Sequence, residues 1–174
     1  MKPDDRKTVD VGGIRTAYYE KGSGPLLVLF HGGNFGSGEL ADSALDWALN
    51  FDGLAERYTV FAIDKIGQGY TDCPKSDADY TMDAVVKHAC ATMDALGLSN
   101  AHLAGHSRGG YLTCRMTMER PDLVATCTII DSNSGAPGIG LNEIVLASPP
   151  GAPRSAECQR WVAEHYSYSP AHVT

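Results

Sequence analysis

The sequence lacks the features that mark membrane, secreted and nucleic-acid-binding proteins. No apolar run approaches the roughly 20 residues that a transmembrane helix needs, and the N-terminal stretch MKPDDRKTVD has no apolar segment typical of a signal peptide. Lysine and arginine form no cluster that relieves the formal net charge of −7, which makes nucleic acid and anionic membranes poor partners. We therefore expect a cytoplasmic protein with no nucleic-acid or membrane partner.

Paired ligands for metals and cofactors are also missing. The five cysteines are odd in number and none has C-x-x-C spacing, so free thiols are expected. The histidines show neither H-x-H nor H-E-x-x-H spacing, and the glycine-rich loops have no following Lys-Ser/Thr and no G-x-G-x-x-G that opens a helix. We expect neither a metal nor a cofactor.

What the sequence does contain is an alternation of strand and helix patterns. Its 174 residues, 43% of them hydrophobic, suit one domain with a sizeable core. The predicted elements are a hairpin over 8–24 that turns at Gly12-Gly13, strands over 25–30, 59–64, 100–106 and 123–131, and helices over 44–58, 81–97 and 108–121. Such alternation indicates an α/β fold with a mostly parallel sheet and helices on both faces. Ligands of such sheets bind beyond the carboxyl ends of the strands.

The composition changes after the last predicted strand. Residues 135–174 read as a Gly-, Ser- and Pro-rich linker, a short helix, a second break and an amphipathic helix. We therefore predict a division into 1–134, the sheet, and 135–174, a linker followed by the beginning of a helical segment.

Ser107 lies in the stretch GHSRGG, between an apolar strand pattern and a helix pattern. A serine hydroxyl that projects from a tight strand-to-helix turn needs small neighbours, and Gly105 and Gly109 supply them. The following helix directs its N-terminal N–H groups toward this point, so the N–H of Arg108 is a candidate donor to a developing oxyanion. The alternative is a structural serine in a glycine-rich turn.

Three motifs together resemble the α/β-hydrolase family. HGG (31–33) resembles its oxyanion loop, DKIGQGYTD (64–72) its D-x-x-G-x-G-x-S loop with Thr71 in place of the serine, and GHSRGG (105–110) its nucleophile elbow. The resemblance implies that Ser107 is the catalytic nucleophile. It implies an oxyanion hole built from the backbone N–H of Gly33 or its neighbour Asn34, together with that of Arg108.

In this family the acid and the histidine follow the serine along the chain. Six strands are predicted here, and residues 135–174 resemble the start of the helical cap that many members insert, so the core is expected to be truncated after strand six. The acid and base are then expected beyond Thr174, in a C-terminal half that would be the partner of this segment. A natural short form is the alternative, and a homodimer, common in the family, also stays open.

Weaker candidates for the acid and base exist within the chain. Asp131 follows the last predicted strand, where some members carry their acid. The histidine at position 31 is expected to order the oxyanion loop, and the one at 106 to point away from Ser107. The remaining histidines, expected on surfaces or in packing, are His88, His102, His165 and His172.

The resemblance implies a serine hydrolase that acts through an acyl-enzyme on a small-molecule carbonyl substrate. An ester or lactone is the first expectation. A meta-cleavage product hydrolase, which cleaves a carbon–carbon bond of an aromatic ring-opening product, is the second. This chain departs from those enzymes at two places: HGGNFGS has no Gly and Pro directly after its paired glycines, and His106 stands where many of them have an Asn before the nucleophile. A non-catalytic ligand-binding module of the same fold is the third.

Overall fold

The computed structural model describes residues 1–33, 42–132, 151, 155–158 and 160–161. The chain divides into two compact units, Met1–Gly135 and Ala136–Thr174. In the second unit Ala156–Cys158, Arg160 and Trp161 are helical. The rest of the predicted linker and cap segment lies outside the described residues, so its role stays a prediction.

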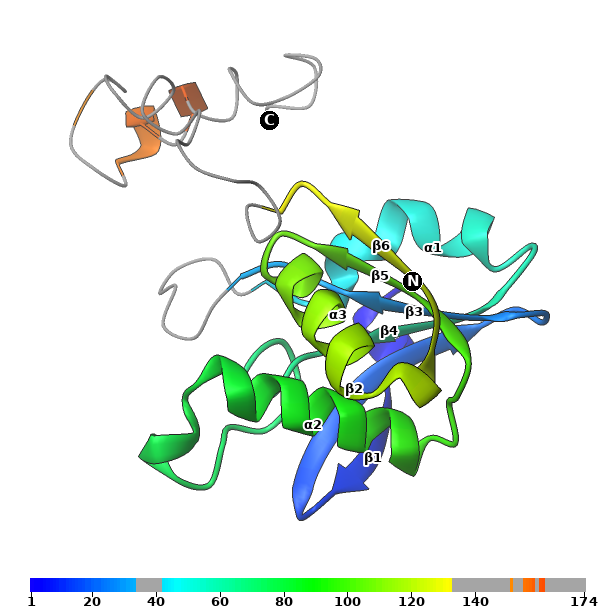
Figure 1. Ribbon diagram of the computed structural model, residues 1–174. Coiled ribbons are helices and arrows are strands. Elements are labelled where there is room, and N and C mark those ends of the chain that lie inside the picture. Colours follow the sequence, from blue (N-terminus) through cyan, green and yellow to red (C-terminus); the bar gives the residue numbers. More distant parts are fainter. Residues whose placement is uncertain (34–41, 133–150, 152–154, 159, 162–174) are drawn as a thin grey trace. The chain divides into compact units, whose positions relative to one another are not determined.

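The first unit is built on a six-stranded sheet with the strand order β1-β2-β4-β3-β5-β6 (Figure 1). β1 pairs antiparallel with β2, and β2 with β4, whereas the β4-β3, β3-β5 and β5-β6 pairs are parallel. The strands are β1 (Lys7–Val11), β2 (Ile14–Lys21), β3 (Leu26–Phe30), β4 (Thr59–Ile63), β5 (Ala101–His106) and β6 (Val124–Ile130). The predicted hairpin is present: Val11 pairs with Ile14, and Gly12 and Gly13 form its turn at φ of 62° and 78°, conformations that glycine adopts without strain.

Helices cover both faces of this sheet because successive strand residues point to opposite sides. In β3, Val28 and Phe30 join a core cluster with α2 (Met82–Ala95) and α3 (Arg108–Glu119). Leu27 and Leu29 join a second cluster with α1 (Ala48–Leu54). In Figure 1, α2 and α3 accordingly lie on one side of the sheet and α1 on the other. The predicted layered arrangement is confirmed.

The predicted helix over 44–58 differs in detail. It begins as a 3₁₀ turn, Ala44–Trp47, and continues as α1. Leu45, Leu49 and Leu54 recur at roughly helical spacing in the sequence, but Leu49 is 98% exposed while Phe51 is buried. The 3₁₀ turn has 3.0 residues per turn rather than 3.6, so the apolar stripe changes phase within the segment.

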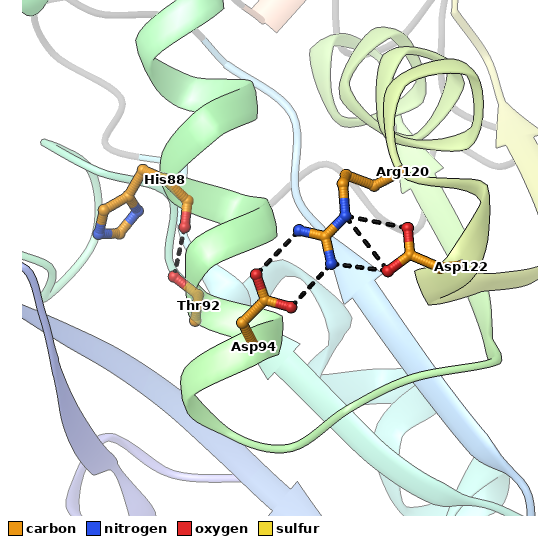
Figure 2. Close-up of polar contacts among 5 residues, drawn as sticks. All are labelled: His88, Thr92, Asp94, Arg120 and Asp122. Atoms are coloured by element: carbon orange, nitrogen blue, oxygen red, sulfur yellow. Dashed lines mark hydrogen bonds and ion pairs between the residues drawn. The ribbon is translucent and has the colours of Figure 1, made fainter.

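The helix α2 begins and ends as the sequence predicts. The Thr81 hydroxyl accepts a hydrogen bond from the N–H of Ala84 at 3.2 Å, and Gly97 follows the helix at φ 68°. Beyond it, Arg120 binds Asp94 at 2.8 and 2.9 Å and also binds Asp122 (Figure 2). This arginine joins the last turn of α2 to the segment that follows α3.

Candidate active site

Ser107 lies between the end of β5 and the start of α3, in a backbone conformation that is rare for a residue with a side chain. Its φ is 52° and its ψ is −116°. The Ser107 N–H donates to the carbonyl of Ile130 at 2.9 Å, and its own carbonyl accepts from the N–H of Gly110 at 2.9 Å. Neighbouring structure therefore holds a turn that would otherwise relax, a pattern typical of functional sites.

The glycines on either side of Ser107 are required by close packing. A Cβ on Gly105 would overlap the carbonyl group of Gly109, and a Cβ on Gly109 would overlap the carbonyl oxygen of Phe30. Both obstacles are backbone atoms, which cannot rotate away. The small residues that the sequence predicted around Ser107 thus allow β3, β5 and α3 to meet at this point.

Arg108 is the first residue of α3, and its side chain is exposed. The N–H groups of a first helical turn have no partner within the helix. The backbone N–H of Arg108, next to the nucleophile candidate, is therefore chemically suited to stabilise negative charge.

The HGG segment after β3, His31–Gly33, which we call the glycine loop, runs beside Ser107. A Cβ on Gly32 would lie 3.4 Å from the Cβ of Ser107 and 3.1 Å from Nδ1 of His106. Gly33 has a φ of 74°, and a Cβ there would overlap the carboxyl group of Asp42. The structure thus brings Gly33 and Arg108, predicted from separate motifs, to the neighbourhood of one serine; Asn34 lies outside the described residues.

The side chain of His31 holds this loop through two hydrogen bonds to backbone groups. The ring is fully buried, and its Nε2 accepts a hydrogen bond from the backbone N–H of Lys65 at 3.2 Å. Nδ1 then carries the proton and donates to the carbonyl of Gly32 at 3.0 Å. Burial, reinforced by the charge of Lys65, lowers the pKa of His31 well below its ordinary value. The imidazole is neutral and is already occupied by backbone partners.

The DKIGQGYTD loop supports the site through Asp64. This buried carboxylate accepts hydrogen bonds from the N–H of Ala44 at 2.6 Å and of Tyr70 at 2.8 Å. Burial raises its pKa, and the two hydrogen bonds oppose that effect. Thr71, in place of the family's serine, donates to the carbonyl of Asp64 and accepts from the N–H of Ala17. A single hydroxyl therefore links this loop to β2.

One residue near the site was not singled out from the sequence. Lys65 is 4% exposed, and its Nζ donates to the carbonyls of Gly32 at 2.6 Å and Gly33 at 3.0 Å. Its pKa falls to about 8, chiefly because the ammonium is buried. A lysine in a polar loop normally points to solvent, so no local sequence signal distinguishes this one.

The base and acid are not identified by the described structure. Within residues 42–132, Ser107 makes hydrogen bonds through its backbone, and no imidazole or carboxylate of that range is bonded to its hydroxyl. His106 lies against Gly32, and Asp131 is exposed at φ 44°. His102 contacts Thr126. His165 and His172 lie outside the described residues.

Among the residues that the structure describes, no group of three or more His, Cys, Asp or Glu side chains could hold a metal ion. No helix there is both long and apolar enough to cross a membrane.

Residues 25–156 match the alpha/beta hydrolase fold family. The chain therefore belongs to the α/β-hydrolase family, as the three motifs predicted. A 2-hydroxymuconate semialdehyde hydrolase from Pseudomonas sp. (strain CF600) is 32% identical over 130 residues, which cover 75% of this chain and 44% of that protein. A fluoroacetate dehalogenase from Burkholderia sp. is 33% identical over 130 residues, 73% of this chain and 40% of that protein. The chain thus spans less than half the length of these two curated relatives.

A solved structure of a meta-cleavage product hydrolase from Pseudomonas fluorescens IP01 is similar with a TM-score of 0.74 at 27% identity. The similarity covers 97% of this chain and 59% of that one. The predicted fold class, a hydrolase core with a mostly parallel sheet, is confirmed by this similarity and by the strand pairings.

Proposed function

We propose that the protein containing this chain is a serine hydrolase that forms an acyl-enzyme on Ser107. The observation that carries the proposal is the φ of 52° at Ser107, between a strand and a helix and beside a glycine loop. A turn that only connects two elements has no need of a strained serine there, because glycine or asparagine would fill it with less strain.

The proposed reaction begins when a general base removes the proton from the Ser107 hydroxyl and the oxygen attacks the substrate carbonyl. The N–H groups of Gly33 (or Asn34) and Arg108 donate hydrogen bonds to the carbonyl oxygen and stabilise the negative charge that develops on it. The leaving group departs with a proton, and water then hydrolyses the ester bond to Ser107. We propose that the base and its carboxylate partner lie outside the residues that the structure describes.

For the substrate, a small ester or lactone remains the first candidate from the sequence. The second candidate is an aromatic ring-cleavage product, hydrolysed at a carbon–carbon bond. Two of the relatives described above support it, since their names assign them to 2-hydroxymuconate semialdehyde and to meta-cleavage products. The dehalogenase supports neither candidate, because its name assigns it to fluoroacetate, which is neither an ester or lactone nor a ring-cleavage product.

The first test is the intact mass of the purified protein before and after treatment with a fluorophosphonate. One adduct that maps to Ser107 and disappears in Ser107→Ala supports the proposal. An unlabelled protein that binds a small ligand without a burst of acylation would instead indicate a non-catalytic binding module.

Substrate choice is tested separately, with a p-nitrophenyl ester and a ring-cleavage dienoate assayed in parallel. Turnover of the ester alone indicates an esterase, and efficient cleavage of the dienoate indicates a carbon–carbon hydrolase. Ser107→Ala should abolish either activity; a variant that retains full turnover would refute the assignment of the nucleophile.

A further inference from the structure

The buried ammonium of Lys65 is bonded to the glycine loop that runs beside Ser107. Its Nζ lies 2.6 Å from the carbonyl oxygen of Gly32 and 3.0 Å from that of Gly33. The backbone N–H of the same residue binds His31 at 3.2 Å. A single residue at the end of β4 therefore holds the loop at the end of β3 through three hydrogen bonds.

These bonds determine the direction of an amide that the proposed mechanism uses. A trans peptide is planar, and its C=O and N–H point in opposite directions. When Lys65 holds the carbonyl of Gly32, the N–H of Gly33 in the same peptide is turned away from the ammonium. Gly33 also has a φ of 74°, a conformation from which an unrestrained glycine would readily depart.

We infer that Lys65 is a positioning residue of the active site, whose ammonium holds the carbonyls of Gly32 and Gly33 so that the N–H of Gly33 is oriented toward the reacting carbonyl oxygen. This inference rests on the proposed hydrolase function. Lys65 acts through the loop and contributes no bond to the substrate.

Charges from each neighbouring element act on this ammonium. Asp42 precedes the 3₁₀ turn and Asp46 lies within it, and both carboxylates favour the charged lysine. Arg108, at the start of α3, opposes it. His31 is neutral, and His106, at the end of β5, lies beside Gly32.

Burial and Arg108 together outweigh the two carboxylates, which places the pKa of Lys65 at about 8. Below that pH the ammonium donates charged hydrogen bonds, which are roughly twice as strong as neutral ones. Above it the neutral amine holds the loop less firmly. Activity should therefore decline as the pH rises through about 8.

The test is Lys65→Met in the intact protein, assayed with a p-nitrophenyl ester across pH 6 to 10. Methionine keeps the length of the side chain and removes its donors. We expect kcat to fall about 10- to 100-fold at neutral pH, below the 100- to 1,000-fold loss of a whole oxyanion donor. KM should change little, and the decline above pH 8 should disappear.

Lys75→Met is the matched control. The Nζ of Lys75 also donates to a glycine carbonyl, that of Gly12, at 2.9 Å. This contact is exposed and lies at the β1–β2 turn, with two strands between β2 and β5. The control variant should keep the kcat and the pH profile of the wild type.

A second variant keeps the inference testable if Lys65→Met does not fold. Asp42→Asn removes a carboxylate that favours the charged lysine, so it should move the alkaline decline of kcat to lower pH. The inference is overturned if Lys65→Met has the same kcat and the same alkaline decline as the wild type. It is also overturned if the alkaline decline of kcat in Asp42→Asn stays at the wild-type pH. Failure of the proposed function gives a different result, namely no Ser107-dependent turnover in the wild type.

Discussion

The strain at Ser107 leads to a prediction in which activity and stability change in opposite directions. A residue with a side chain that is held in a sparsely populated backbone region lowers the free energy of unfolding by about 1–3 kcal/mol. Ser107 is such a residue, with a φ of 52°. Ser107→Gly removes that strain but adds the entropy of a glycine to the unfolded chain, a loss of about 0.5–1 kcal/mol. The expected net gain in the free energy of unfolding is about 1 kcal/mol.

The reference for this measurement is Ser107→Ala rather than the wild type. Both variants lack the hydroxyl and should be inactive, but alanine keeps the Cβ that causes the strain. Ser107→Gly should therefore have the higher urea midpoint of the two, by an amount equivalent to about 1 kcal/mol at an unchanged slope with denaturant.

Asn100→Gly serves as a control away from the site. Asn100 has a φ of 50° in the turn before β5, and asparagine tolerates this region better than serine does. We expect a smaller gain in stability and unchanged activity. If Ser107→Gly is no more stable than Ser107→Ala, the strain argument is wrong.

Two further predictions concern residues that support the core. Asp64→Ala removes the acceptor for the N–H groups of Ala44 and Tyr70. Hydrogen bonds to a charged group contribute about 1.5–3 kcal/mol each, so the loss of both should lower the free energy of unfolding by about 3–6 kcal/mol. A loss below about 1 kcal/mol in urea unfolding would contradict this role. Burial lowers the pKa of His88 to about 4, against an ordinary value of 6.5, so the unfolded chain binds a proton that the folded protein excludes. Stability should therefore fall by up to about 3 kcal/mol as the pH drops from about 6.5 to 4. Nε2 of His88 lies 3.0 Å from the hydroxyl of Thr16, and His88→Gln keeps a hydrogen-bond partner for that hydroxyl while removing the titrating group. The variant should lose this part of the acid dependence, and an identical acid profile in both proteins would refute the assignment.

The sequence by itself determined the order of the elements and the motifs at their ends. The turn at Gly12-Gly13, the helix over 81–97 and the glycines around Ser107 were readable because each depends on a few neighbouring residues. The strands predicted over 25–30 and 59–64 correspond to β3 and β4 for the same reason. The 3₁₀ turn before α1 could not be read in this way, and the spacing of Leu49 along the chain does not show that this side chain is exposed.

Only the tertiary structure decided which residues support the site. The pairing of β3 with both β4 and β5 places Gly32 beside Ser107 and brings Lys65 beneath the loop, although these residues are far apart in the chain. Burial of Lys65 and its approach to Asp42 and Arg108 depend on three separate segments meeting at the carboxyl ends of parallel strands. Desolvation and charge act through space rather than along the chain, so a sequence pattern contains no local signal for them.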